Sequence, residues 1–405
     1  MQVPFFRPDI RDAEIAEVLD TLRSGWLTTG PKTQRFEAAF AEAVGGRHAL
    51  AVNSCTAALH IAVEALGLEA GEGVLVPTMT FAATAEVVRY LGAVPILVDC
   101  DPRTLNIDLS HADQLLADIA RGVFPPGVSA ATRVVGIIPV HYGGYMVDID
   151  AVRAFATRHG LWVVEDAAHS FPAAWRPGVD APWRRCGEGT SDVTCFSFYA
   201  NKTITTGEGG MAVTDRPDLA ERMRLMSLHG LSRDAWGRYS GGGTWDYKIV
   251  APGFKYNLTD VAAAIGLHQL ARAEEMRAGR EERAGWYRAR FAATPFVECP
   301  PSDPTRLHAW HLFPIQLRVD QLAVTRNQVM EALKASGVVA SVHWRPLHMH
   351  PYYQERFGYT PGACPAAAAT FDRLLSLPLF PTMTVEEVEY VVSTVRQACG
   401  EAVTV

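Results

Sequence analysis

Short apolar runs alternate with amphipathic stretches along the first half of the chain, and this alternation predicts an α/β fold. Near-continuous apolar runs are typical of strands buried on both faces, whereas apolar positions three or four apart indicate helices. The predicted strands cover residues 48–53, 73–77, 94–98, 134–140, 161–165, 193–198 and 210–213, and the predicted helices between them cover 54–66, 81–91 and 149–159. We therefore expect a mainly parallel central sheet sandwiched by helices.

Two amphipathic helices precede the first strand. We expect Asp12 to cap the first helix and Gly25 to end it, with an apolar face formed by Ile15, Val18, Leu19 and Leu22. The second helix runs from Phe36 to Val44.

The pattern changes after the last predicted strand. A long helix, continuous or broken once, covers about 257–288 and closes a large domain, for which we predict the bounds 1–270. An apolar segment at 309–317 and helices at 327–336 and 385–398 then predict a smaller α+β domain over 271–405. We expect the polar segment 172–189 to be a surface loop and 240–243 to be flexible.

Composition and charge narrow the class of protein. The 405 residues exceed one typical core, and 48% apolar and 20% charged residues are typical of a soluble globular protein. A net charge of −7 argues against nucleic-acid partners, and no apolar stretch is long enough to span a bilayer. The seven cysteines are odd in number and contain no CxxC pair, so we predict free thiols in the cytoplasm and no metal site.

A lysine and an aspartate follow two of the predicted strands. Functional residues gather at the carboxyl ends of parallel strands, where Asp166 and the segment carrying Lys202 fall. Pyridoxal phosphate (PLP) chemistry needs such a pair, because a lysine holds the aldehyde as an imine and a carboxylate keeps the pyridine nitrogen protonated. Alone, Asp166 would be a strand-end turn residue and Lys202 a surface lysine.

A phosphate site is predicted beside this pair. Ser54 opens the helix after the first strand, and a helix N-terminus presents free N–H groups to an anion. Taken alone Ser54 is more simply a capping residue, but together with the lysine and the aspartate the anion site is the better interpretation. Ser197 can reach the phosphate from the lysine segment, and the glycines at 207, 209 and 210 allow a close approach of backbone.

Two ring-bearing residues complete the predicted cofactor site. Phe81 follows a strand and could stack on the pyridine ring, although alone it would be a core residue. His169, shortly after Asp166, could contact the cofactor or be a satisfied core histidine.

In this order, the motifs resemble the DegT/StrS-type sugar aminotransferase family of fold type I PLP enzymes. The segments that carry the resemblance are 24–31, 54–59, 139–144, 165–169, 196–202, 206–210, 253–260 and 341–348, so it covers nearly the whole chain. It implies that Lys202 forms the imine, Asp166 pairs with the ring nitrogen and Phe81 stacks on the ring. It also implies a phosphate cup formed by Ser197, Cys55 and Thr56.

The resemblance further implies partners. Asn257 matches an asparagine that reaches the phosphate of the neighbouring subunit, so a homodimer with shared active sites is expected. A nucleotide-linked sugar is expected near Trp26, Thr29, Tyr199, His229 and the segment 343–348, which includes His343 and Arg345. Relatives often have glycine at the position of Cys55, position 199 is variable, and the loop 175–189 looks longer than usual.

The implied reaction is a ping-pong transamination in the PLP and pyridoxamine phosphate (PMP) forms. L-glutamate is the expected donor and a keto sugar nucleotide the acceptor. The patterns at 253–260 and 343–348 look most like enzymes that act at C4 of a 4-keto-6-deoxy sugar. A PLP-dependent sugar dehydratase, in which histidine can replace the lysine, a 3-keto sugar aminotransferase and a non-catalytic regulator are the alternatives.

Overall fold

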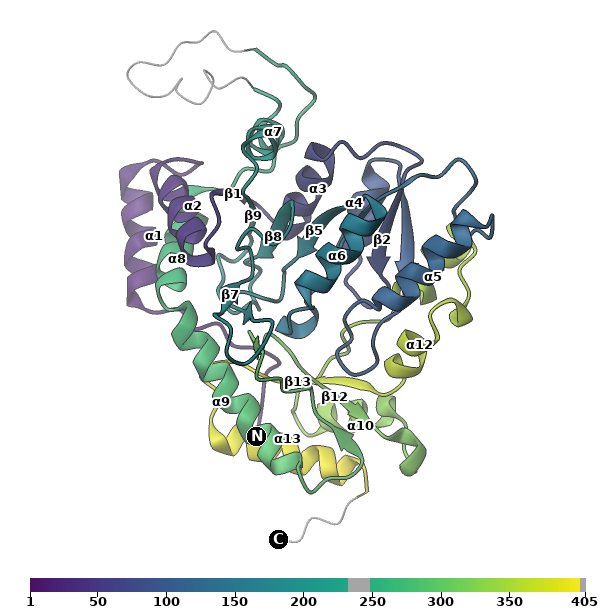
Figure 1. The fold of residues 1–405 in the computed structure, drawn as a ribbon. Helices are drawn as coiled ribbons and strands as arrows, with labels where there is room; N and C mark the ends of the chain where they lie inside the picture. The colour runs from purple at the N-terminus through teal and green to yellow at the C-terminus, as the bar shows by residue number, and fades with distance from the viewer. Residues whose placement is uncertain (232–247, 401–405) are drawn as a thin grey trace.

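A computed structural model describes residues 1–231 and 248–400 of the chain (Figure 1). Its centre is a seven-stranded sheet in the order β1-β9-β8-β5-β4-β2-β3. The strands are β1 (His48–Val52), β2 (Gly73–Pro77), β3 (Val94–Val98), β4 (Val134–Ile137), β5 (Trp162–Asp166), β8 (Val193–Ser197) and β9 (Gly210–Thr214). All neighbouring pairs from β8 to β3 are parallel, and β9 alone is antiparallel to both of its neighbours. The predicted mainly parallel sheet is confirmed.

Helices cover both faces of this sheet (Figure 1). One apolar core contains side chains of α2 (Pro31–Val44), α5 (Leu109–Ala120), α6 (Ile149–His159) and α8 (Asp260–Ala271). The other contains side chains of α3 (Cys55–Ala65), α4 (Ala83–Tyr90), α7 (Pro217–Ser227) and α11 (Pro351–Phe357). Strands buried on both faces explain the near-continuous apolar runs in the sequence.

The C-terminal part of the chain builds a smaller sheet with its own core. This sheet has the order β10-β12-β13, formed by Val297–Glu298, Phe313–Leu317 and Leu374–Leu377, and both pairs are antiparallel. Its core contains side chains of α9 (Ala273–Phe291), α10 (Arg326–Ala335) and α13 (Val385–Ala398). A further helix, α12 (Pro365–Phe371), packs in a separate small cluster with Leu374 of β13 and with Met79 and Tyr142 of the N-terminal region. The C-terminal region therefore has the expected α+β character.

The first helix, α1 (Asp12–Ser24), does not pack on the predicted face, of which only Val18 is partly buried. Ile15, Leu19 and Leu22 are 51%, 44% and 51% exposed, whereas Glu14 is buried because its carboxylate binds Arg272 and Gln269 of the α8 end. Asp12 is the first helical residue and not the cap; the N–H of the preceding residue is bound by the Glu14 carboxylate instead.

The segment 172–189 is not the simple surface loop that its polarity predicts. Residues Ala174–Trp175 form β6, which pairs with β7 (Arg184–Arg185) and with β11 (Arg306–Leu307) in a third, antiparallel sheet. Trp175 is only 1% exposed, since it belongs to an apolar core of the central sheet, and two arginine side chains also lie over its ring.

Other predicted bounds need smaller corrections. The helix predicted from Phe81 begins at Ala83, the strand 134–140 ends at Ile137, and the long helix 257–288 is divided into α8 and α9. The predicted flexible residues 240–243 lie outside the described residues. Within the described ranges, no helix is both long enough and apolar enough to cross a membrane.

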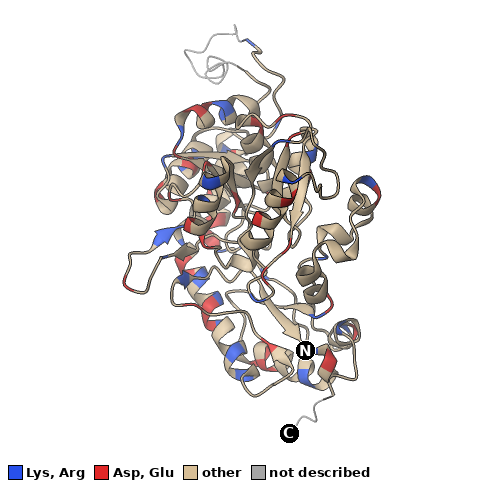
Figure 2. Cartoon of the chain, turned by 45° about the vertical axis from the view of Figure 1, so that its right-hand side comes forward, with Lys and Arg blue, Asp and Glu red and all other residues tan. Residues whose placement is uncertain are grey.

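Charged residues of both signs are interspersed along the helices (Figure 2). Many form ion pairs within or between helices, such as Arg277 with Glu281 along α9 and Arg222 of α7 with Glu64 of α3. Such pairs on exposed helix faces contribute little stability individually, at most about 1 kcal/mol each.

Candidate active site

A cavity of about 540 Å³ opens at the carboxyl ends of β5 and β8, where the parallel strands end together. Its walls come from the starts of α3 and α4, the loops after β5 and β8, and two segments of the C-terminal region. The lining residues include Ser54, Cys55, Thr56, Phe81, Asp166, His169, Ser197, Tyr199, Lys202, His311, His343 and Trp344. Besides Ser54, nine of the predicted cofactor and substrate residues therefore share one cavity.

Lys202 lies in the loop between β8 and β9. Its N–H donates to the carbonyl of Tyr199, at 2.9 Å, and its Nζ lies 3.4 Å from Nε2 of His311. Burial disfavours the ammonium form and lowers the pKa of Lys202 to about 8. At pH 7, about one-tenth of such lysines carry the neutral amine that a nucleophile requires.

Asp166 ends β5 and faces the same cavity. Its Oδ2 accepts from Thr84 Oγ1 at 2.8 Å, and its Oδ1 accepts from the N–H of Ala168 at 3.1 Å. Burial is the main influence on this carboxyl and raises its pKa, and no ion pair joins it to a cation among the described side chains. A protonated ring nitrogen beside Asp166 would compensate the buried charge, so the site fits a pyridinium group.

The N-terminus of α3 forms the opposite end of the cavity. Ser54 caps the helix, since its Oγ accepts from the N–H of Ala57 at 3.0 Å. The first N–H groups of a helix have no intrahelical acceptor, so those of Cys55 and Thr56 are available to an anion. A Cβ on Gly210 would lie 2.5 Å from the carbonyl of Ser54, so only glycine lets β9 approach this turn. These features fit the phosphate of PLP.

The thiol of Cys55 has a structural explanation. Its Sγ lies 3.6 Å from the carbonyl oxygen of Cys195 on β8, to which it donates. Burial raises the pKa of Cys55 well above its ordinary value, so the group is a neutral thiol and not a nucleophile. All seven cysteines are free, as predicted.

Aromatic side chains border the space between Lys202 and Asp166. Phe81 is 58% exposed, with its ring centre 5.2 Å from that of Trp344. The ring of Trp344 lies 5.9 Å from that of His169 with an interplanar angle of 25°. His169 Nδ1 accepts from the N–H of Gly143, and burial keeps its pKa well below the ordinary value, so this imidazole is neutral.

Of the predicted substrate residues, Tyr199 and His343 line the cavity. Tyr199 is 46% exposed, and His343 is buried with its Nδ1 2.9 Å from Ser376 Oγ. Arg345 is exposed and lies outside the cavity lining.

Four further predicted residues also lie outside the lining of this cavity: Trp26, Thr29, His229 and Asn257. Asn257 Nδ2 donates to Thr29 Oγ1 at 2.7 Å, and the indole N–H of Trp26 donates to the carbonyl of Thr29 at 3.1 Å. These three residues thus form one hydrogen-bonded group between the loop that follows α1 and the segment that precedes α8. A single chain does not bring them to Lys202.

The sequence does not predict three residues that the fold brings to the site: Thr84 binds Asp166, His311 contacts Lys202, and Glu208 lines the wall. Trp344, which also lines the wall, belongs to the predicted substrate segment 343–348. The histidine of the segment 309–317 was a visible signal, because a polar residue within an apolar run needs a partner.

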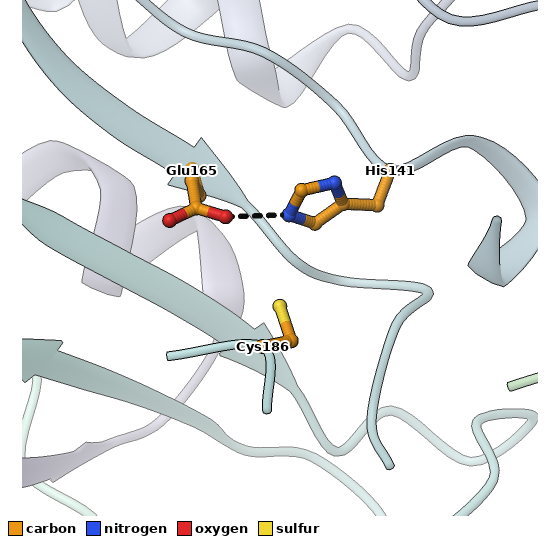
Figure 3. Close-up of side chains that lie close together, drawn as sticks. All are labelled: His141, Glu165 and Cys186. Atoms are coloured by element: carbon orange, nitrogen blue, oxygen red, sulfur yellow. Dashed lines mark hydrogen bonds and ion pairs between the residues drawn. The ribbon is translucent and has the colours of Figure 1, made fainter. Parts of the chain in front are cut away.

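A buried cluster of His141, Glu165 and Cys186 lies beside β5 (Figure 3). His141 Nε2 is 2.8 Å from Glu165 Oε2, and its Nδ1 accepts from the N–H of Val147 at 3.2 Å. Nδ1 therefore carries no proton, and Nε2 carries the proton that is donated to Glu165. A metal on Nε2 would require a proton on Nδ1, facing another N–H, so this arrangement does not suit a metal ion.

A parallel-sheet α/β fold with a half-buried lysine, a strand-end aspartate and a helix N-terminus around one cavity defines a fold type I PLP enzyme. The comparisons give the family: residues 8–396 match the DegT/DnrJ/EryC1/StrS aminotransferase family, and the chain belongs to it.

Relatives of known description agree with this assignment. The spore coat polysaccharide biosynthesis protein SpsC of Bacillus subtilis (strain 168) is 43% identical over 397 residues, which are 97% of this chain and 96% of SpsC. Spr1654 of Streptococcus pneumoniae, described as a candidate sugar aminotransferase, is similar in its PMP form with a TM-score of 0.86 and 30% identity. That match covers 98% of this chain and 99% of Spr1654, which has also been solved in its PLP form.

A second solved structure supports the same fold and class. Helicobacter pylori PseC, an aminotransferase involved in the biosynthesis of pseudoaminic acid, has a TM-score of 0.87 and 25% identity. The similarity covers 98% of this chain and 99% of PseC. The predicted family, fold type and PLP cofactor are confirmed, and the chain is a PLP-dependent sugar aminotransferase by family.

Proposed function

We propose that this enzyme transfers an amino group from L-glutamate to C4 of a 4-keto-6-deoxy sugar carried on a nucleotide. The observation that carries the transamination is the position of Lys202, whose Nζ lies in the same cavity as Asp166 and has a pKa of about 8. The patterns at 253–260 and 343–348 support C4 over C3. A sugar product also agrees with SpsC and PseC, whose descriptions refer to polysaccharide and pseudoaminic acid biosynthesis.

The residues of this chain have separate tasks in that reaction. PLP supplies an electron sink that makes the proton on the α-carbon of the amino donor removable. Lys202 binds the cofactor in the resting enzyme and, once released, moves the proton between the donor carbon and the cofactor. Asp166 keeps the ring nitrogen protonated, and Ser197, Thr56 and the start of α3 bind the phosphate.

The walls of the cavity would orient the ring and exclude water. Phe81 and His169 both line the cavity, and we assign them to the two faces or the edge of the ring. Tyr199 and His343 line the same cavity, and we assign them to the sugar nucleotide. A neutral His343, whose pKa burial lowers to about 3, suits hydrogen bonding to sugar hydroxyls.

We also propose a cytoplasmic homodimer with shared active sites. The exposed apolar side chains of Ile15, Leu19 and Leu22 on α1 support an interface there. The hydrogen-bonded group of Trp26, Thr29 and Asn257 includes the loop that directly follows α1, so the partner subunit could receive these residues in its cavity. We retain the domain division at 270/271 as part of the proposal, and the separate C-terminal core supports it.

The test is the absorption spectrum of the PLP-loaded enzyme during each half-reaction. L-glutamate should convert the PLP spectrum to that of PMP, and 4-keto-6-deoxy nucleotide sugars should reverse it faster than 3-keto sugars. NMR of the product then locates the new amino group. A spectrum that responds only to 3-keto sugars refutes the C4 assignment, whereas one that ignores every amino donor favours the dehydratase.

A further inference from the structure

His311 lies beside the amino group of Lys202, although the two residues are 109 positions apart in the sequence. Its Nε2 lies 3.4 Å from Lys202 Nζ, within reach of a hydrogen bond. The imidazole is only 5% exposed and packs against the ring of His169, with ring centres 4.4 Å apart. Its Nδ1 has no hydrogen-bond partner among the described residues, so the contact with Lys202 is the polar interaction that this ring makes there.

Hydrogen bonds to backbone groups fix the position of the segment that carries His311. Arg280 on α9 is 3% exposed, and its Nη1 donates to the carbonyls of Trp310, His311 and Leu379 at 3.3, 3.4 and 2.9 Å. In addition, the N–H of Leu312 donates to the carbonyl of Gly143, next to the loop after β4. A buried arginine bound to carbonyls restrains the segment, so the imidazole has a fixed position relative to Lys202.

We propose that His311 is a positioning residue that accepts a hydrogen bond from Lys202 Nζ whenever the lysine is not bonded to the cofactor. The lysine is released in each half-reaction and must then exchange a proton with two carbon atoms. An Nζ held by one fixed acceptor occupies a narrow range of positions, and small displacements of a reacting group cost large factors in rate. This inference depends on the family's PLP chemistry but not on which sugar is the acceptor.

The groups around Lys202 determine whether the loss of His311 raises or lowers the pKa of this lysine. The other titratable groups that face it are Asp166 on β5, Cys55 on α3, Arg280 on α9, and the histidines at 169 and 343. Burial keeps the pKa of His311 well below its ordinary value, so His311 is a neutral acceptor. A neutral acceptor stabilises the ammonium form of Lys202, and its removal should lower the pKa of the lysine.

The test compares His311→Leu with His311→Gln in the full-length apoenzyme. Leucine removes the acceptor, whereas the amide oxygen of glutamine can occupy the position of Nε2. The rate of PLP capture, followed by absorbance, rises with pH as Lys202 loses its proton, because only the neutral amine adds to the aldehyde with loss of water. We expect the midpoint of this profile to fall by roughly one pH unit in His311→Leu and to return close to the wild-type value in His311→Gln.

A second readout measures the proton transfer itself. In single-turnover reactions with the amino donor, His311→Leu should be slower by roughly a hundredfold, with a larger isotope effect from α-deuterated donor, and His311→Gln should recover most of the rate. His60→Leu is the matched control, because His60 is a buried histidine outside the cavity. It should leave the midpoint unchanged.

Three results would overturn the inference. Equal midpoints in wild type and His311→Leu would show that no hydrogen bond to the free lysine is formed. Equal shifts in the leucine and glutamine variants, or the same shift in His60→Leu, would show a general packing effect. If the proposed sugar substrate is wrong, these measurements still test the role of His311, because PLP capture requires no sugar.

Discussion

Replacing Glu165 by glutamine is predicted to destabilise the folded protein by about 2–4 kcal/mol. The carboxylate is fully buried and accepts from His141 Nε2 at 2.8 Å, Thr190 Oγ1 at 2.6 Å and Thr194 Oγ1 at 3.3 Å. Hydrogen bonds to a charged acceptor contribute about 1.5–3 kcal/mol each, against about 1 kcal/mol for neutral ones.

The geometry of His141 makes the glutamine amide a poor substitute. The amide NH2 cannot face His141 Nε2, which is itself a donor, so the amide oxygen must accept there and the NH2 group must face the hydroxyls of Thr190 and Thr194. Those hydroxyls then lose their acceptor and must turn to accept, and His141 bonds to a neutral instead of a charged oxygen; relief from burying a charge offsets part of the total cost.

The assay is urea unfolding of the apoprotein at pH 7.5, followed by tryptophan fluorescence and extrapolated to zero denaturant. Glu282→Gln is the matched control, because Glu282 is an exposed carboxylate paired with Arg283 and should change stability by less than about 1 kcal/mol. A Glu165→Gln variant within about 0.5 kcal/mol of wild type would refute the reasoning.

The pH dependence of the same variant gives an independent check. The pKa of Glu165 in the folded protein is lowered through its bonds with His141 and Thr190 despite the opposing effect of burial. A lowered folded pKa gives stability that is present above the unfolded pKa, about 4.3, and is lost as the pH falls through the folded value. The difference between wild type and Glu165→Gln should therefore shrink below about pH 4.

Three further predictions concern the cofactor site. Gly210→Ala should weaken PLP binding at least about tenfold in a fluorescence titration, because its Cβ would meet the Ser54 carbonyl; Gly178→Ala, which has open space, should not. Asp166→Asn should retain PLP but lose roughly a hundredfold or more in turnover with the amino donor, and near-normal turnover would contradict the ring-nitrogen role. Alkylation of Cys55 at pH 8, read by peptide mass spectrometry, should be at least about tenfold slower in the folded than in the urea-unfolded protein, since burial raises its pKa; equal rates would contradict that.

The sequence contained enough signal to predict the central sheet and the cavity around Lys202. Strands buried on both faces are near-continuous apolar runs, and parallel strands necessarily bring their carboxyl ends to one edge. The residues that the sequence placed at strand ends or helix starts, such as Asp166 and Cys55, consequently share the cavity.

The predictions that failed concern segments that pack against residues far away in the sequence. The apolar positions of α1 predict its buried face from the helix alone, whereas in the structure Glu14 faces inward because its carboxylate binds Arg272. The arginines and other polar residues of the segment 172–189 predict a surface loop. In the structure, the guanidinium groups of Arg184 from this segment and of Arg306 from β11 lie over the ring of Trp175.

His311 shows a different limit. It follows Lys202 by 109 residues and reaches it only because the C-terminal region folds back across the sheet. Its position within an apolar run indicated a buried histidine but not its partner, since the partner is determined by the packing of two regions and not by local spacing.

The most direct test of the central claim is the attachment site of PLP. Reduction of the holoenzyme with borohydride, followed by proteolysis and mass spectrometry, should find the phosphopyridoxyl group on Lys202 alone, at about one per chain. Lys202→Ala should yield no labelled peptide under the same conditions. Label on another lysine, or undiminished labelling in the variant, would contradict the assignment of Lys202 as the cofactor-binding residue of this aminotransferase.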